Sequence, residues 1–178
     1  LKSKTSINFT DIPYSNLECE YAIQFINDTE IKDGIQKNLN NLKLYCALDI
    51  TSSRYEQKSK LNFNKLIQMY LGIADHGNGG RIIIGEEIKN WKNILLNNIK
   101  IKLNINGKKT EPFFTGSKRV HPIDSLKVFI EEFKSKKYQF KANDFLLCGS
   151  LIEPYNIKKN DYIKVEYEDL GNMELSIV

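Results

Sequence analysis

The sequence is poor in the residues that mark disulfide-rich, zinc-binding and membrane-spanning proteins. It has 3 cysteines in 178 residues, and Cys19, Cys46 and Cys148 lie far apart without C-x-x-C spacing, which argues against a disulfide framework and a zinc site. No apolar run approaches the length that spans a membrane. The first residues also lack the apolar segment of a secretory signal. We therefore expect a protein of a reducing, cytoplasmic compartment, with no membrane partner.

The chain also lacks a strong excess of charge of one sign. It has 26 Lys and Arg against 22 Asp and Glu, a net charge of +4. The basic residues alternate with acidic ones instead of forming a stripe, so we expect no nucleic-acid partner. With 41% hydrophobic residues, the chain can bury the core of one domain, which we expect to extend over residues 1–178.

Apolar residues that alternate with polar ones predict a fold dominated by strands. The two longest alternating segments are Leu17–Phe25 and Leu42–Ile50. Shorter strands are predicted at Arg81–Gly85, Ile99–Ile105, Phe145–Cys148, Tyr162–Tyr167 and Met173–Val178. Helical spacing predicts helices at Phe63–Ala74, with Asn62 as the N-cap, and at Pro122–Phe133. The fold class that follows is α+β.

Three acidic residues lie on the polar faces of the two longest predicted strands. Glu18 and Glu20 are two residues apart, so their side chains share one face. Asp49 lies opposite the apolar face of the second strand. Carboxylates in such a group are the hard oxygen ligands that Mg²⁺ prefers. A pair of this kind is also typical of an ordinary solvent-facing strand, and the spacing alone leaves both interpretations open.

The glycine-rich segment Asp75–Arg81 follows the first predicted helix and must be a loop. Its backbone amides could hold an anionic substrate, although it lacks the G-K-[ST] ending of a P-loop. His76 is a candidate base in this loop, whereas a lone loop histidine is usually only exposed. No serine has a G-x-S-x-G setting, so the sequence gives no clear nucleophile.

These segments occur in an order that resembles a known enzyme family. The order is the E-x-E strand, A-L-D-I-T-S-S-R, I-A-D-H-G-N-G-G-R-I-I-I-G, I-N-G-K-K, H-P-I-D-S-L-K-V-F, N-D-F-L-L-C-G-S and K-N-D-Y-I-K-V-E-Y-E-D-L-G. It resembles the 2-keto-4-pentenoate hydratase and 4-oxalocrotonate decarboxylase family of the fumarylacetoacetate hydrolase superfamily. The similarity extends over nearly the whole chain. It implies a mixed β-roll or sandwich of the fumarylacetoacetate hydrolase C-terminal type, with two or three helices.

The resemblance also implies a metal site. It assigns Glu18, Glu20 and Asp49 as ligands of Mg²⁺ or Mn²⁺, where the third ligand in hydratases is usually Glu. Arg54 matches the arginine of the family's D-S-R motif and is expected to be catalytic, although Ser52 replaces the aspartate of that motif.

Other motif positions imply contacts with the substrate. The family's A-D-N-x-S loop matches Ala74–Asn78, which places His76 as a catalytic candidate and Asn78 as a substrate contact. The family's T-G-S turn borders the substrate carboxylate, and Gly149 and Ser150 match it.

The implied activity is that of a metal-dependent hydratase. It would add water to a 2-hydroxy-2,4-dienoate, as in aromatic compound catabolism, and yield a 4-hydroxy-2-oxo acid. Three alternatives remain: decarboxylation of 2-oxo-3-enedioates, C–C hydrolysis of acylpyruvates, and a non-catalytic homologue that pairs with an active subunit. The family's N-terminal segment, which carries a lysine and acidic residues thought to serve the active site, is expected to be missing from these 178 residues. The family also implies a homo-oligomer.

Overall fold

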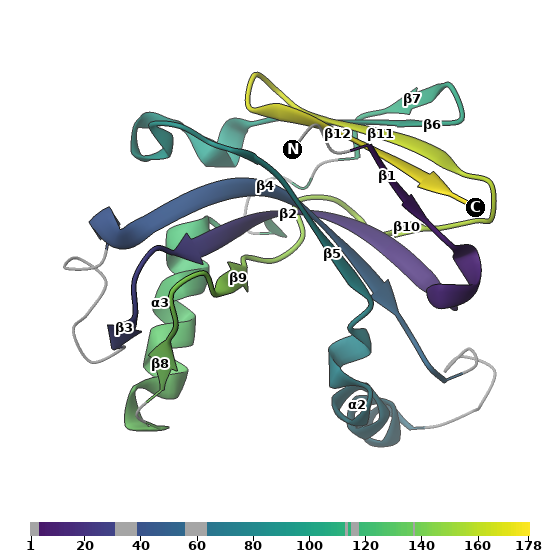
Figure 1. Ribbon diagram of the computed structural model, residues 1–178. Coiled ribbons are helices and arrows are strands. Elements are labelled where there is room, and N and C mark those ends of the chain that lie inside the picture. The colour runs from purple at the N-terminus through teal and green to yellow at the C-terminus, as the bar shows by residue number, and fades with distance from the viewer. Residues whose placement is uncertain (1–3, 31–38, 56–63, 113, 115–117, 137) are drawn as a thin grey trace.

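Two stacked β-sheets form the body of the protein, as the computed structural model in Figure 1 shows. The structure describes residues 4–30, 39–55, 64–112, 114, 118–136 and 138–178. The first sheet has, in order, β1 (Lys4–Ile7), β12 (Gly171–Ile177), β11 (Tyr162–Tyr167), β6 (Ile101–Ile105) and β7 (Lys108–Thr110). The second has β10 (Tyr155–Asn156), β2 (Ser15–Phe25), β4 (Leu42–Ser52) and β5 (Arg81–Glu87), and β9 (Phe145–Leu147) also pairs with β2.

The remaining regular elements lie outside these two sheets. A small third sheet joins β3 (Thr29–Glu30) to β8 (Gln139–Phe140). The helices α2 (Lys65–Ala74) and α3 (Pro122–Phe133) lie on the side of the second sheet that faces away from the first (Figure 1). The α+β class and the dominance of strands are therefore confirmed.

Alternation along β2 and β4 places the core between the two main sheets. The odd-numbered residues of β2 and the even-numbered residues of β4 are buried, and Tyr21 of β2 contacts the ring of Tyr167 on β11. The Tyr167 hydroxyl donates a hydrogen bond to the carbonyl of Ala47 on β4, with 2.5 Å between the oxygens. This bond ties the first sheet to the centre of the second.

Glycine is required at two positions in the sheets, one in a tight turn and one where two strands approach closely. Asn106 and Gly107 both have positive φ, 52° and 89°, and they form the tight turn between β6 and β7 that the Asn-Gly pair predicts. Gly80 enters β5 so close to β4 that an added Cβ would lie 2.2 Å from the carbonyl oxygen of Ile50. Only glycine fits there, and β5 is thereby held against β4.

The helix α3 matches its predicted range and packs as expected. Leu126 is buried, and the Ser125 hydroxyl donates to the carbonyl of Cys148 at 2.6 Å. The imidazole of His121 accepts a hydrogen bond from the backbone amide of Ile123 at the start of the helix. All three cysteines are buried and free. None of the helices in the described residues is both long and apolar enough to cross a membrane.

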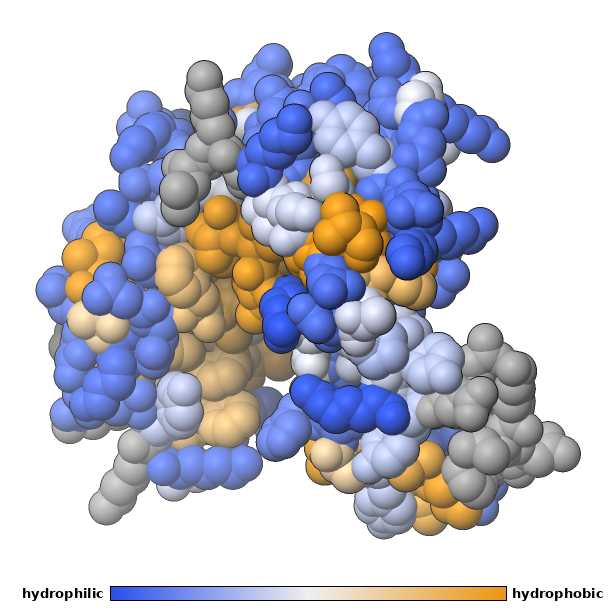
Figure 2. All heavy atoms as spheres, turned by 45° about the vertical axis from the view of Figure 1, so that its right-hand side comes forward, coloured by the Kyte–Doolittle hydropathy of each residue, from blue (hydrophilic) through white to orange (hydrophobic). Residues whose placement is uncertain are grey.

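The helix α2 differs from its prediction in its start and in its packing. The N-cap is Asn64, whose side chain accepts from the amide of Ile67, while the predicted cap Asn62 lies outside the described residues. None of the residues of α2 is buried. Five of its large apolar side chains are 40–67% exposed: Leu66, Ile67, Met69, Tyr70 and Ile73. In Figure 2 apolar atoms gather on the lower surface of the molecule, where α2 lies.

Other differences concern strands. The predicted strand Arg81–Gly85 extends to Glu87, and its first two residues are exposed. The polar segment 28–41, which the alternation leaves unassigned, contains β3 and a 3₁₀ turn at Leu39–Asn41 within its described part. The pattern gave no signal for β1, which pairs in parallel with β12.

Replacement of Tyr167 by Phe tests the hydrogen bond that joins the sheets. The change keeps the ring and leaves the buried carbonyl of Ala47 without this donor, so we expect a loss of about 1 to 2 kcal/mol in the free energy of unfolding. Urea unfolding would measure it. Tyr70→Phe is the control, because Tyr70 is 57% exposed on α2. Equal midpoints for the two variants would contradict this role of the bond.

Candidate metal and substrate site

The pairing of β2 with β4 brings the predicted acidic residues to one face of the second sheet. Glu18 lies directly opposite Asp49 in the register, and Glu20 lies opposite Ala47. Because side chains alternate along a strand, all three carboxylates are directed away from the first sheet. The face that they share is the one on which α2 and α3 lie (Figure 1).

Glu20 is the most buried of the three, with 4% of its surface exposed. One carboxylate oxygen accepts a hydrogen bond from the backbone amide of Gly149 at 2.8 Å. Gly149 has φ of +97°, a conformation that favours glycine, and this turn presents the amide to Glu20. Burial raises the pKa of Glu20 to about 7; the Gly149 amide opposes this rise, and the charges of Asp49 and Glu18 add to it.

Glu18 and Asp49 are half-buried, and burial raises the pKa of both carboxyls. The negative charge of Asp49 raises the pKa of Glu18 further, while the Ser150 hydroxyl lowers it. No lysine, arginine or histidine in the described ranges forms a salt bridge with Glu18, Glu20 or Asp49. The face therefore holds like charges that a divalent cation would neutralise.

The three carboxylates share a face but do not converge as closely as the sequence predicts. Within the part of the chain that the structure describes, no group of three Asp, Glu, His or Cys side chains is close enough together to hold an ion. The chemistry of the three side chains nevertheless suits Mg²⁺, because all three are carboxylates and no described lysine, arginine or histidine is paired with them.

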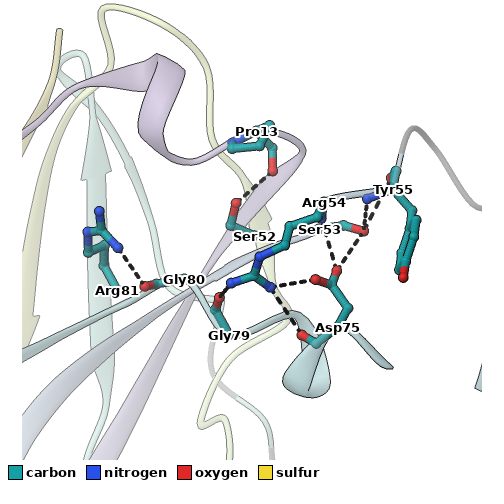
Figure 3. A network of polar contacts seen from close by, with 9 residues as sticks. All are labelled: Pro13, Ser52, Ser53, Arg54, Tyr55, Asp75, Gly79, Gly80 and Arg81. Atoms are coloured by element: carbon teal, nitrogen blue, oxygen red, sulfur yellow. Dashed lines mark hydrogen bonds and ion pairs between the residues drawn. The ribbon is translucent and has the colours of Figure 1, made fainter. Parts of the chain in front are cut away.

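Arg54 is engaged in a structural contact that the sequence did not reveal. Its guanidinium forms an ion pair with the buried side chain of Asp75, with 2.5 Å between Nη1 and Oδ1, and also donates to the carbonyl of Gly79 (Figure 3). The backbone amide of Arg54 donates to the second oxygen of Asp75 at 2.9 Å. Hydrogen bonds from the Arg54 side chain hold the pKa of Asp75 below its usual range.

This network fixes the glycine-rich loop to the end of β4. It joins residues of two motifs, Arg54 and Asp75, that are 21 residues apart in the chain. Ser52, at the position of the family's aspartate, is also engaged: its hydroxyl donates to the carbonyl of Pro13 at 2.8 Å (Figure 3).

The loop residues His76 and Asn78 lie in a short 3₁₀ turn and both have positive φ, 49° and 62°. His76 is exposed, and Asn78 is partly buried. Among the described contacts, no hydrogen bond or ion pair joins the His76 side chain to Glu18, Glu20 or Asp49. The Ser150 hydroxyl, which lowers the pKa of Glu18, donates to the carbonyl of Ile152 at 2.8 Å.

Comparisons with known proteins identify the fold. The chain is 22% identical to a 4-oxalocrotonate decarboxylase of Pseudomonas putida over 132 residues, 74% of this chain and 47% of that protein. Its fold matches a solved 4-oxalocrotonate decarboxylase from Pseudomonas putida G7 complexed with magnesium and adipate, with a TM-score of 0.77 and 17% identity, over 97% of this chain and 64% of that one.

A second solved structure belongs to the wider group. It is a fumarylacetoacetate hydrolase family protein from Yersinia pestis CO92, with a TM-score of 0.64 and 15% identity, over 99% of this chain and 79% of that one. No protein-family model matches the chain. These likenesses show that the chain has the fold of fumarylacetoacetate hydrolase family proteins. It spans about half the length of the curated relative and 64% of the solved decarboxylase.

The raised pKa of Glu20 predicts a pH-dependent cost that Glu20→Gln removes. The folded carboxyl titrates at about 7 and an unfolded one near 4.5, so the folded state binds more protons between these values and wild-type stability falls as pH rises through them. In buffer that contains a metal chelator, we expect the free energy of unfolding of the variant to exceed that of wild type by about 2 to 3 kcal/mol above pH 7.5. Below pH 4.5 the two should differ little. Denaturant unfolding across pH measures this.

The matched control for this titration is Glu166→Gln, because Glu166 pairs with Lys102 on the first sheet. It should leave the wild-type pH dependence between 4.5 and 7 in place. If Glu20→Gln showed the same pH dependence as wild type, Glu20 would not be the group that titrates near neutrality.

Proposed function

We propose that this chain carries the site of a divalent-metal-dependent lyase that hydrates 2-hydroxy-2,4-dienoates to 4-hydroxy-2-oxo acids. The observation that carries this proposal is the acidic face of β2 and β4, where Glu18 and Asp49 are paired directly and Glu20 lies one row along. Three partly or fully buried carboxylates without a described cation are costly to fold. A bound metal ion would offset that cost and would also chelate an acidic substrate.

Glu18, Glu20 and Asp49 would hold the ion, which we propose to be Mg²⁺ or Mn²⁺. When bound, such an ion acts as a Lewis acid that stabilises negative charge on a substrate oxygen. The solved decarboxylases that share this fold are complexed with magnesium and adipate in one case and with calcium and acetate in another. A divalent ion together with a carboxylate ligand therefore suits this fold.

The other predicted residues would position and protonate the substrate. The Gly149 amide orients Glu20, and Ser150 and Asn78 are proposed to contact the substrate. The Arg54–Asp75 ion pair holds the loop that presents His76. His76 is exposed and is our candidate for proton transfer, while Arg54 acts through Asp75 as a positioning residue.

Decarboxylation of 2-oxo-3-enedioates is the second candidate, because the relatives named above are 4-oxalocrotonate decarboxylases. Both reactions require stabilisation of the same enolate charge beside a carboxylate. The loose arrangement of the three carboxylates favours the third alternative, a homologue without activity. Metal binding separates this last alternative from the two enzymes.

Titration calorimetry with Mg²⁺ and Mn²⁺ tests the metal site. We expect one ion to bind per chain, and Glu18→Gln or Asp49→Asn to weaken binding on the order of tenfold or more, because each change removes a charged oxygen ligand. Glu166→Gln, on the first sheet, should bind as wild type does. A wild-type chain that takes up neither ion would favour the non-catalytic homologue.

Parallel assays of dienol hydration and CO₂ release test the reaction. With Mg²⁺ or Mn²⁺ present, we expect consumption of 2-hydroxypenta-2,4-dienoate, and loss of metal-dependent turnover in Glu20→Gln. CO₂ release from a 2-oxo-3-enedioate without hydration would establish the decarboxylase instead. Unchanged turnover in Glu20→Gln would remove the assignment of the metal site.

A further inference from the structure

The edge strand β5 places an apolar row beside the acidic face. In the register of β4 with β5, Asp49 lies opposite Ile82 and Ala47 lies opposite Ile84. Both isoleucines therefore share the face of the carboxylates, while Ile83 between them packs against the core. Ile82 is 55% exposed, which is high for a large apolar residue next to charged groups.

The two rows have a spacing that suits a short acid. Neighbouring strands lie about 4.8 Å apart, so Ile82 is about 5 Å from Asp49 and about 10 Å from Glu18 across the sheet. A 2-oxo acid held by its carboxylate and 2-oxygen at β2 and β4 has a carbon chain long enough to cross one strand spacing. The side chain of Ala47, on the same face of β4, is small and does not obstruct a carbon chain that crosses β4.

The described cations near this row are already engaged. Arg54 is paired with Asp75, and Lys43, on the carboxylate face of β4, is paired with Glu87. Arg81 lies opposite Ile50, so alternation places its side chain on the other face of the sheet. A second carboxylate at the far end of a substrate would lie over isoleucine, close to Asp49 and without a described positive partner. Such a group would lose its hydration and gain no ion pair.

We propose that Ile82 and Ile84 form the surface on which the carbon chain of the substrate lies. This inference rests on the proposed function and narrows its substrate class. The site selects 2-oxo acids that have one carboxylate and an apolar tail over 2-oxo diacids. Ile82 is thus a specificity-determining residue on the strand that follows the glycine-rich loop.

Competition binding at saturating Mg²⁺ or Mn²⁺ tests this selectivity without turnover. The probes are oxalate, 2-oxopentanoate and 2-oxohexanedioate, measured by calorimetry. Wild type should bind 2-oxopentanoate roughly fivefold or more tightly than 2-oxohexanedioate, because only the first buries its tail on the isoleucines. Ile82→Ala should weaken 2-oxopentanoate alone, and Ile82→Lys should reverse the order of the two acids. Oxalate, which has no tail, should bind all three proteins equally.

Val128→Lys is the matched control, because Val128 is 64% exposed on α3 and the change adds the same charge away from β5. It should bind all three acids as wild type does. If wild type and Ile82→Lys each bound the two oxo acids with equal affinity, the proposed selectivity would be wrong. Binding of oxalate in the same experiment would still support the proposed function. Failure of oxalate to bind in the presence of metal would overturn both.

Discussion

The antiparallel register of β2 and β4 is the constraint on which the rest of the structure depends. It runs over eleven residue pairs, from Ser15 opposite Ser52 to Phe25 opposite Leu42. A slip of one residue would turn the apolar face of either strand to solvent and its carboxylates into the core. The packing of the core and the position of the acidic face are therefore set by one and the same pairing, and neither can change alone.

The sequence predicts what is local in this arrangement. Period-two alternation locates β2 and β4 within two residues at each end, and the Asn106–Gly107 turn and helix α3 follow from equally local patterns. It does not predict which residues meet. The amide of Gly149 reaches Glu20 across 129 positions, and only the resemblance to a family indicated that Gly149 and Ser150 belong to the site. The sequence of β5 does not indicate that Ile82 lies beside Asp49, because strand pairing is a tertiary contact that local patterns do not specify.

The differences from prediction have one physical origin. Periodicity indicates that an element has an apolar face but does not identify what covers it, and the stripe of α2, from Leu66 to Ile73, is exposed. Motif matching indicates that Arg54 matters but not why. Its guanidinium forms an ion pair with Asp75 and donates to the carbonyl of Gly79. The segment that follows β4 and the glycine-rich loop therefore stabilise each other. For Arg54 the missing information was its partner, Asp75, which a single sequence does not identify.

The acidic face makes the fold less stable at the place where we propose the metal site. Burial raises the pKa of all three carboxyls, and repulsion from Asp49 adds to this for Glu18 and Glu20, so each charge makes folding less favourable at neutral pH. A glycine with φ of +97° then donates its amide to the most buried of them, which lowers the penalty without removing it. Neutral side chains on the same face would give a more stable protein. Costs of this kind are concentrated at functional sites, and the apolar row of β5 beside the carboxylates completes a surface that is charged at one end and apolar at the other, as a short 2-oxo acid is.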